Sequence, residues 1–193
     1  MKRLLKLFFI RISQLLVLPC AAICWAEGSL CDHSEAFFLF WSHLFSILPG
    51  TPGLFIRRAF YTLTLERCSP ECYIGFGAIF THRATIVEKN AYVGLYALIG
   101  SAHLGERCLI GSRASLLSGG YLHSRREDGS WAPFDPSQMI QIKIGRDAWI
   151  GEGAVVMADV GDGSMVAAGS VVSSNIKANI VVAGNPARFV RNL

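Results

Sequence analysis

The stretch that decides the fold runs from Ile144 to Val172 and reads IGRDAWIGEGAVVMADVGDGSMVAAGSVV. An aliphatic residue recurs every sixth position in each part of it, and Gly follows several of these residues directly. A helix repeats near every 3.6 residues and a strand at every second residue, so neither explains a period of six. A solenoid does, if three hexads form a three-sided coil whose aliphatic side chains point inward and stack on the next coil.

The same period covers most of the chain from residue 72 onward. Its aliphatic positions are Ile74, Phe80 and Ile86; Val93 and Ile99; Leu104, Ile110, Leu116 and Leu122; Ile144, Ile150 and Val156; and Val160, Val166 and Val172. Small residues such as Ala78 and Ala84 stand four positions later and would fit near tight corners, while the Gly would permit the turn conformation. We therefore predict an all-β solenoid over residues 71–193, with a C-terminal tail and an inserted loop at 118–141, where the repeat stops.

Composition sets the remaining limits. With 193 residues the chain has room for one domain and a short appendage. It is 52% apolar and 17% charged, with a mean hydropathy of +0.40, which is more apolar than a soluble domain needs to fill its core. The net charge of +4 and the absence of aromatic residues interleaved with Arg or Lys argue against nucleic-acid binding.

The apolar excess lies in residues 1–70, which we expect to form short helices. Residues 4–26 look like a membrane span, but only about fifteen residues follow the interruption at Arg11, fewer than a crossing needs. Residues 36–48 follow Asp32 and Ser34, a layout typical of an N-capped helix. They stop at the Pro- and Gly-rich cluster 49–53.

The segment after this cluster, LFIRRAFYTLTLERC at 54–68, has helical spacing with Arg57, Arg58 and Arg67 as its polar positions. Basic residues that flank Phe and Trp suit a helix in the headgroup layer of a membrane. We expect residues 1–70 to contact the membrane surface. The alternative is that these helices cap the solenoid or pack in an oligomer.

Six cysteines raise the question of a metal or of disulfides: Cys20, Cys24, Cys31, Cys68, Cys72 and Cys108. Their spacing, without a suitable His pair, does not fit a tetrahedral zinc site. We interpret them as buried thiols in a reducing compartment, and expect a cytoplasmic protein peripheral to the inner membrane.

Residues 72–190 resemble the hexapeptide-repeat acyltransferases. The strings that carry the resemblance are DAWIGEGAVV at 147–156, VAAGSVV at 166–172, AGNPARFVR at 183–191 and SLLSGGYLHSR at 115–125, and the segment 49–68 resembles the leader of a cell-envelope branch. The resemblance implies a left-handed parallel β-helix, a homotrimer and acetyl-CoA as co-substrate, with no metal. The implied activity is O-acetyl transfer to a hydroxyl of a sugar or lipid-linked envelope glycan.

Acyl transfer to a hydroxyl needs a base, and a neutral histidine suits that role near pH 7. His123 lies in the inserted loop and matches the family's active-site histidine, so we predict it as general base in a mechanism without a covalent intermediate. His82 ranks second and His103 third, whereas His33 and His43 lie in the helical region. In the same loop, Glu127 and Asp128 are candidates to orient the imidazole, and the backbone at 118–120 could supply oxyanion donors.

For coenzyme A, the resemblance implies backbone contacts at Gly151, Glu152 and Ala168, with Trp149 beside the groove and Arg188 or Arg191 near the phosphates. A packing role is the alternative for Trp149. The chain reads Ser173-Ser174-Asn175 where the family often has Thr-Lys-Asp, which removes a usual basic residue.

Two other functions remain open. A zinc enzyme of the carbonic-anhydrase type would need His82, His103 and His123 to converge, although that family places two ligands five residues apart and this chain has no such pair. A non-catalytic solenoid that serves as a membrane scaffold would need neither the inserted loop nor the Asn-Pro-Ala-Arg ending.

Overall fold

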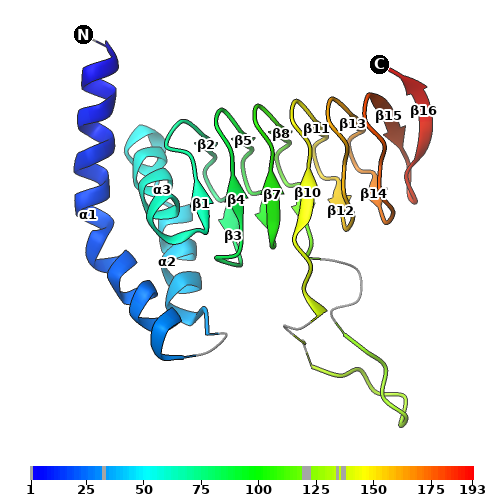
Figure 1. Cartoon of the computed structure of the whole chain (residues 1–193), viewed down its shortest axis with the longest axis horizontal. Coiled ribbons are helices and arrows are strands. Elements are labelled where there is room, and N and C mark those ends of the chain that lie inside the picture. The colour runs from blue at the N-terminus through cyan, green and yellow to red at the C-terminus, as the bar shows by residue number, and fades with distance from the viewer. Residues whose placement is uncertain (1, 32–33, 119–122, 134, 136–137) are drawn as a thin grey trace.

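The computed structural model describes residues 2–31, 34–118, 123–133, 135 and 138–193. Figure 1 shows two parts side by side: three helices at the N-terminal end, and a row of stacked coils that continues to the C-terminus. The helices are α1 (Lys2–Leu30), α2 (Ala36–Ser46) and α3 (Gly50–Thr64). The first solenoid strand, β1 (Arg67–Cys68), follows α3 almost directly.

Three sheets form the sides of the solenoid. The four-stranded sheet has the order β1, β4 (Ile86–Val87), β7 (Ala102–Leu104), β10 (Ile142–Ile144). The seven-stranded sheet has the order β16 (Arg188–Asn192), β15 (Ile180–Ala183), β13 (Met165–Val166), β11 (Trp149–Ile150), β8 (Leu109–Ile110), β5 (Tyr92–Val93), β2 (Tyr73–Ile74). The five-stranded sheet has the order β14 (Val171–Val172), β12 (Val155–Val156), β9 (Ser115–Leu116), β6 (Leu98–Ile99), β3 (Ile79–Phe80). All pairings are parallel except that of β15 with β16.

One buried aliphatic or aromatic residue from each side stacks on its equivalents in the neighbouring coils. The stack of the seven-stranded sheet is Ile74, Val93, Ile110, Ile150, Val166 and Val182, and that of the five-stranded sheet is Phe80, Ile99, Leu116, Val156 and Val172. Each of these side chains is at most 2% exposed. The predicted all-β solenoid is confirmed over these coils, because the period of six places one inward residue on each side.

The third stack corrects one predicted position. Val87, not Ile86, is buried and pairs in register with Leu104. The neighbouring small position also shifts, since Thr85 is fully buried and Ala84 is not. The corner before β4 holds one extra residue, and a one-residue shift in a strand exchanges its two faces. The predicted position Leu122 lies outside the described residues.

All variation in coil length falls at one corner, between the five-stranded and four-stranded sheets. At the other two corners, six positions separate successive inward residues in every coil. At the variable corner the pairs are Phe80 to Val87, Ile99 to Leu104, Leu116 to Ile144, Val156 to Val160, and Val172 to Ile176. The long loop is therefore an insertion at a corner whose length already varies.

Gly has a different role at the corners from the predicted one. The left-handed conformation is found two positions after the place that Gly often takes behind the inward residue. The residues in this conformation include Asn90, Tyr96, Arg107, Arg113, Asp147 and several glycines. Gly94 and Gly111 are not among them. A Cβ on Gly94 would lie 2.6 Å from the Ser112 nitrogen, and one on Gly111 would lie 2.6 Å from the Glu152 nitrogen. Gly is needed here because successive backbones approach too closely to admit a side chain.

The helices also depart from expectation. α1 continues across Pro19 to Leu30 and is longer than the short helix predicted, and Figure 1 shows that it bends along its length. The N-terminus of α2 is capped from α1, since Glu27 accepts bonds from the Phe37 amide at 3.0 Å and the Phe38 amide at 3.3 Å. The expected cap residue Asp32 lies outside the described residues.

Helix α3 closes the first coil of the solenoid with aromatic side chains. Tyr61 is fully buried, its ring lies 4.5 Å from that of Phe80, and its hydroxyl is 2.7 Å from the Ser42 hydroxyl. Because α3 lies between the other helices and this coil, its predicted polar residues Arg57 and Arg58 are only 2% and 7% exposed. Two of the three arginines predicted as the polar positions of this helix are therefore enclosed in the protein.

All six cysteines are free thiols. Cys24, Cys68, Cys72 and Cys108 are buried, as predicted, and the Sγ atoms of Cys68 and Cys72 are 3.8 Å apart. Cys31 is exposed, contrary to the prediction, because it lies just beyond the end of α1.

Candidate functional site

A long arm leaves the solenoid between β9 and β10, at the corner of variable length. Figure 1 shows it extending away from the coils. At its base, the Ile140 amide donates to the Ser118 carbonyl at 3.0 Å. Near its tip, the Arg126 amide donates to the Ser130 carbonyl at 2.9 Å, in a turn that contains Gly129 at φ +82°. The described part of the arm is thus held by its own backbone hydrogen bonds.

His123 lies on this arm and is exposed. Its Nδ1 is 3.0 Å from the Ala132 carbonyl oxygen. A carbonyl can only accept, so Nδ1 carries the proton and the lone pair of the neutral ring is on Nε2. This is the tautomer that a general base needs. The arm that carries this residue extends away from the coils (Figure 1).

The two predicted orienting carboxylates differ in position. Asp128 accepts hydrogen bonds from the Ser130 hydroxyl at 2.6 Å and from the Ser130 amide at 2.8 Å, and these bonds hold the pKa of Asp128 below its usual value. Its side chain therefore stabilises the turn of the arm, while Glu127 is exposed. At the base of the arm, the Ser118 hydroxyl accepts a bond from the Ser101 amide at 2.7 Å. The other predicted oxyanion donors, Gly119 and Gly120, lie outside the described residues.

Three predicted coenzyme positions lie together at the corner between the seven-stranded and five-stranded sheets. A Cβ on Gly151 would lie 2.4 Å from the Ala168 nitrogen, so these backbones are in close contact. The Gly169 amide donates to the Glu152 carbonyl at 2.9 Å, which links the same two coils. The Glu152 side chain forms an exposed ion pair with Arg113. The corner presents closely spaced backbone with few bulky side chains.

The aromatic and cationic positions lie on the seven-stranded sheet. Trp149 is on β11, 48% exposed, and faces out of the solenoid two residues before Gly151. Arg188 and Arg191 are exposed on β16, the last strand of the same sheet. At the variable corner, the Asn175 side chain accepts a bond from the Asp159 amide at 3.1 Å, so this residue links two coils.

His82 has a carboxylate partner that the sequence did not predict. Its Nδ1 is 2.6 Å from Oε2 of Glu35, and Oε1 of Glu35 accepts a bond from the Arg83 amide at 2.7 Å. Burial raises the pKa of Glu35, but the hydrogen bonds from His82 and Arg83 outweigh it and lower the pKa below the usual value. The two residues are 47 positions apart, on a helical segment and a coil, so no local signal in the sequence could have paired them.

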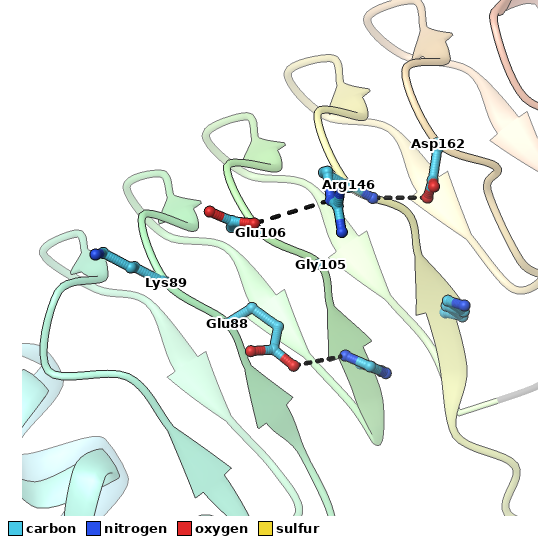
Figure 2. A pocket seen from close by; sticks show the side chains of 8 residues that line it. Glu88, Lys89, Gly105, Glu106, Arg146 and Asp162 are labelled. Carbon is cyan, nitrogen blue, oxygen red and sulfur yellow. Dashed lines mark hydrogen bonds and ion pairs between the residues drawn. The ribbon is translucent and has the colours of Figure 1, made fainter.

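His103 lines an open polar pocket of about 520 Å³ on the four-stranded sheet. Its Nε2 is 3.2 Å from Oε1 of Glu88. Figure 2 shows Glu106 and Arg146 from neighbouring coils beside each other in this pocket, with Arg146 Nε 3.8 Å from Glu106 Oε2. The backbone amide of Arg146 donates to Asp162 at 2.8 Å. The pocket combines both signs of charge, which suits a ligand with many hydroxyl groups, and the sequence prediction missed it apart from His103.

The described residues contain no group of three His, Cys, Asp or Glu side chains that could hold a metal ion. Among the described side chains, His82 and His103 each contact a different carboxylate, and His123 lies on the arm. This arrangement does not favour a zinc site built from the three histidines.

The chain resembles several known proteins. Residues 141–174 match the family model for the hexapeptide repeat of succinyl-transferase. The chain is 32% identical over 124 residues to the putative lipopolysaccharide biosynthesis O-acetyl transferase WbbJ of Escherichia coli (strain K12), covering 61% of this chain and 62% of that protein. It is 34% identical over 131 residues to the galactoside O-acetyltransferase of the same strain, covering 64% and 59%. The chain thus spans about three fifths of the length of these curated relatives.

A maltose O-acetyltransferase from Clostridium difficile 630 has a similar fold, with a TM-score of 0.54, 18% identity, and coverage of 82% of this chain and 86% of that one. The hexads, the parallel coils and the relatives agree on one fold, the left-handed parallel β-helix. The chain is therefore similar in sequence and in fold to the hexapeptide-repeat acyltransferases.

Proposed function

We propose that the protein is an acetyl-CoA-dependent O-acetyltransferase that modifies a hydroxyl of a sugar or of a lipid-linked envelope glycan. The observation that carries this proposal is the similarity to two O-acetyltransferases, one of them named for lipopolysaccharide biosynthesis. The exposed histidine on the arm and the closely spaced backbone of the last coils provide the two parts that such a reaction needs.

His123 acts as general base in this proposal. Nε2 takes the proton of the acceptor hydroxyl while its oxygen attacks the thioester carbonyl, and collapse of the tetrahedral intermediate releases coenzyme A. The imidazolium then returns its proton to the departing thiolate, so no covalent enzyme intermediate forms. The bond between Nδ1 and the Ala132 carbonyl keeps the ring in the required tautomer and supports its positive charge.

Coenzyme A lies along the corner at Gly151, Glu152 and Ala168. The pantetheine arm can approach the backbone there because few side chains stand in its way. Trp149 provides an exposed apolar surface next to this corner. Arg188 and Arg191 on the last strand of the same sheet are placed to pair with phosphates, which a guanidinium recognises well.

The site is completed between subunits of a homotrimer. His123 belongs to the arm, which extends away from the coils in Figure 1, so a second copy of the chain brings the arm and a coenzyme corner together in this proposal. The seven-stranded sheet also has an exposed ladder for such a contact: Tyr73, Tyr92, Leu109 and Trp149, each 36–48% exposed. In a closed cyclic assembly, the arm of every copy meets the coenzyme corner of a neighbouring copy.

The helices attach the trimer to the inner membrane from the cytoplasmic side. The large apolar side chains exposed on α1 and α2 include Phe8, Leu15, Leu16, Phe37, Phe40 and Ile47. The stretch Phe8–Leu30 is long and apolar enough to cross a membrane by length and composition. Near each of its ends, α1 contacts α3, through Phe9 to Phe55 and through Trp25 to Leu63. These contacts favour α1 lying along the membrane surface instead. The free thiols fit a reducing compartment.

The test is acetyl transfer by the full chain in mild detergent, with labelled acetyl-CoA and a set of glycans and lipid-linked sugars. His123→Ala should lower kcat by about 10²–10⁴-fold, the usual contribution of general acid–base catalysis. The thermal transition and coenzyme A affinity should stay near wild type. His43→Ala is the matched control, because His43 is exposed on α2. Full activity of His123→Ala would remove His123 from this role.

A further inference from the structure

A cavity of about 330 Å³ lies between the start of α3 and the first coils of the solenoid. Its lining includes Gly50, Thr51, Leu54, Arg57 and Tyr73. The first turn of α3 borders this cavity, so the positive end of the helix dipole faces it. Hydroxyl groups of Thr51 and Tyr73 add two further donors. None of the residues that line the cavity belongs to the arm or to the corner assigned above to coenzyme A, and Tyr73 also belongs to the ladder proposed for the subunit contact.

Arg57 brings a buried positive charge to this cavity. The residue is 2% exposed, its Nη1 donates to the Leu48 carbonyl at 2.6 Å, and its Nε donates to the Ile74 carbonyl at 3.1 Å. Two longer bonds from Nη1 reach the carbonyls of Phe45 and Ser46. Carbonyl groups satisfy these donors but carry no negative charge. Among the described residues, no carboxylate lies within ion-pair distance of Arg57.

Arg58, the next residue, is a second buried arginine in this helix. It is 7% exposed, and its Nη2 is buried without a hydrogen-bond partner among the described residues. Its guanidinium lies 4.8 Å from the centre of the Phe55 ring, and it too has no described carboxylate partner. Burial lowers the pKa of both guanidinium groups, which measures the cost of holding these charges away from water. Arg58 does not line the cavity, and the groups that interact with its charge are the thiols of Cys72 and Cys68. Arg57 does line it, and because buried charges are normally paired, this arginine without a described carboxylate partner indicates a place for an anion.

An apolar groove adjoins the cationic cavity. It has a volume of about 330 Å³ and lies between α1 and α3, where Phe9, Ile12, Leu16 and Phe55 line it. Thr51 lines both the groove and the cavity, so the two meet at the first turn of α3. Phe9, Ile12 and Leu16 are also 37–66% exposed, so the groove continues into the apolar surface proposed to face the membrane.

We propose that the cavity at Arg57 binds the phosphate of an anionic membrane phospholipid whose hydrocarbon chain lies in the groove between α1 and α3. The lipid phosphate supplies the negative charge that Arg57 lacks, and a guanidinium matches its oxygens well. This inference rests on the proposed membrane attachment and names its partner. It does not depend on acetyl transfer.

Binding is measured with the full chain in nonionic detergent and without acetyl-CoA, so a failure here is separate from a failure of the proposed enzyme activity. Dioctanoyl phosphatidylglycerol should raise the thermal transition and give saturable binding by calorimetry. Inorganic phosphate alone should bind at least about tenfold more weakly, a difference of about 1.4 kcal/mol. Dioctanoylglycerol, which has the chains but no phosphate, should produce no stabilisation.

Thr51→Glu tests the site without removing a buried arginine, because Thr51 is exposed at the junction. The new carboxylate should compete with the phosphate and weaken phosphatidylglycerol binding by at least about tenfold. Ser174→Glu, at an exposed corner of the solenoid, adds the same charge elsewhere and should leave binding unchanged. Arg57→Gln should abolish binding if its far-ultraviolet spectrum stays native. Unchanged affinity of Thr51→Glu, or equal stabilisation by dioctanoylglycerol, would overturn the proposal, as would inorganic phosphate binding as tightly as the lipid.

Discussion

Gly94→Ala should destabilise the solenoid although it adds only one methyl group. The new Cβ would lie 2.6 Å from the Ser112 nitrogen and 2.8 Å from the Gly111 carbonyl carbon. Ordinary contact begins near 3.4 Å, so the two coils must separate locally by about 0.8 Å. That shift stretches the hydrogen bond from the Gly94 amide to the Ile110 carbonyl, now 2.8 Å, beyond its useful range.

The cost combines two terms. One or two weakened backbone hydrogen bonds contribute about 1 kcal/mol each, and overpacking adds about 1–3 kcal/mol. We expect a loss of about 3 kcal/mol in the free energy of unfolding, or a fall of roughly 6–12 °C in Tm for a chain of this size. The assay is thermal denaturation followed by circular dichroism in mild detergent.

Gly153→Asn is the matched control. Gly153 has φ +66° and no atom within 4 Å of an added Cβ, and Asn already occupies the equivalent left-handed conformation at Asn90 and Asn179. It should cost less than about 1 kcal/mol. If the two variants lose the same stability, or if Gly94→Ala matches wild type, close approach of the coils is not the reason for glycine after the aliphatic position.

Three further outcomes follow from exposed or charged positions. Trp149→Ala should raise KM for acetyl-CoA by about fivefold, since an aromatic contact contributes about 1 kcal/mol. Steady-state kinetics measures this, and an unchanged KM together with a fall in Tm would assign Trp149 to the subunit contact alone. Glu35→Gln should destabilise the protein at neutral pH. Because the folded pKa of Glu35 is depressed, its contribution is complete above about pH 4.3 and disappears as the pH falls further. Equal denaturation curves of variant and wild type at pH 7 would contradict a stabilising role for the hydrogen bonds that Glu35 makes with His82 and the Arg83 amide. The double variant Leu15→Glu/Phe40→Glu should move the protein from the membrane to the soluble fraction, whereas Val190→Glu, exposed on β16, should not. Sedimentation of the double variant with membranes would exclude these helices as the anchor.

The solenoid could be predicted from the sequence because every side of a coil contributes one inward residue. These residues, such as Ile150 and Val156, recur six positions apart. This rule needs no knowledge of distant contacts. It failed at Ile86, where the corner before β4 is one residue longer and Val87 takes the inward position. A local period cannot indicate such an insertion when two aliphatic residues are adjacent.

Features that depend on contacts between distant segments were not predictable. Arg57 and Arg58 are polar positions in a segment with helical spacing, yet the helices and the first coil enclose them. The partner of His82 is Glu35 from another segment, and the cap of α2 is Glu27 of α1. For the candidate site, the chemistry of His123 and the coenzyme corner remain predictions from resemblance. The structure adds the hydrogen bond of His123 to Ala132 and shows that the arm extends away from the coils (Figure 1).

The confinement of every length change to a single corner makes the scaffold modular. New segments can be grafted near Asp159 or Asn175 without altering the rows of inward side chains, because those positions lie at the same edge as the natural insertion. Closing a longer loop costs little, about 0.6 kcal/mol for each doubling of its length. Chains of this architecture can thus acquire new surface segments along one edge while the corner proposed for coenzyme A stays constant.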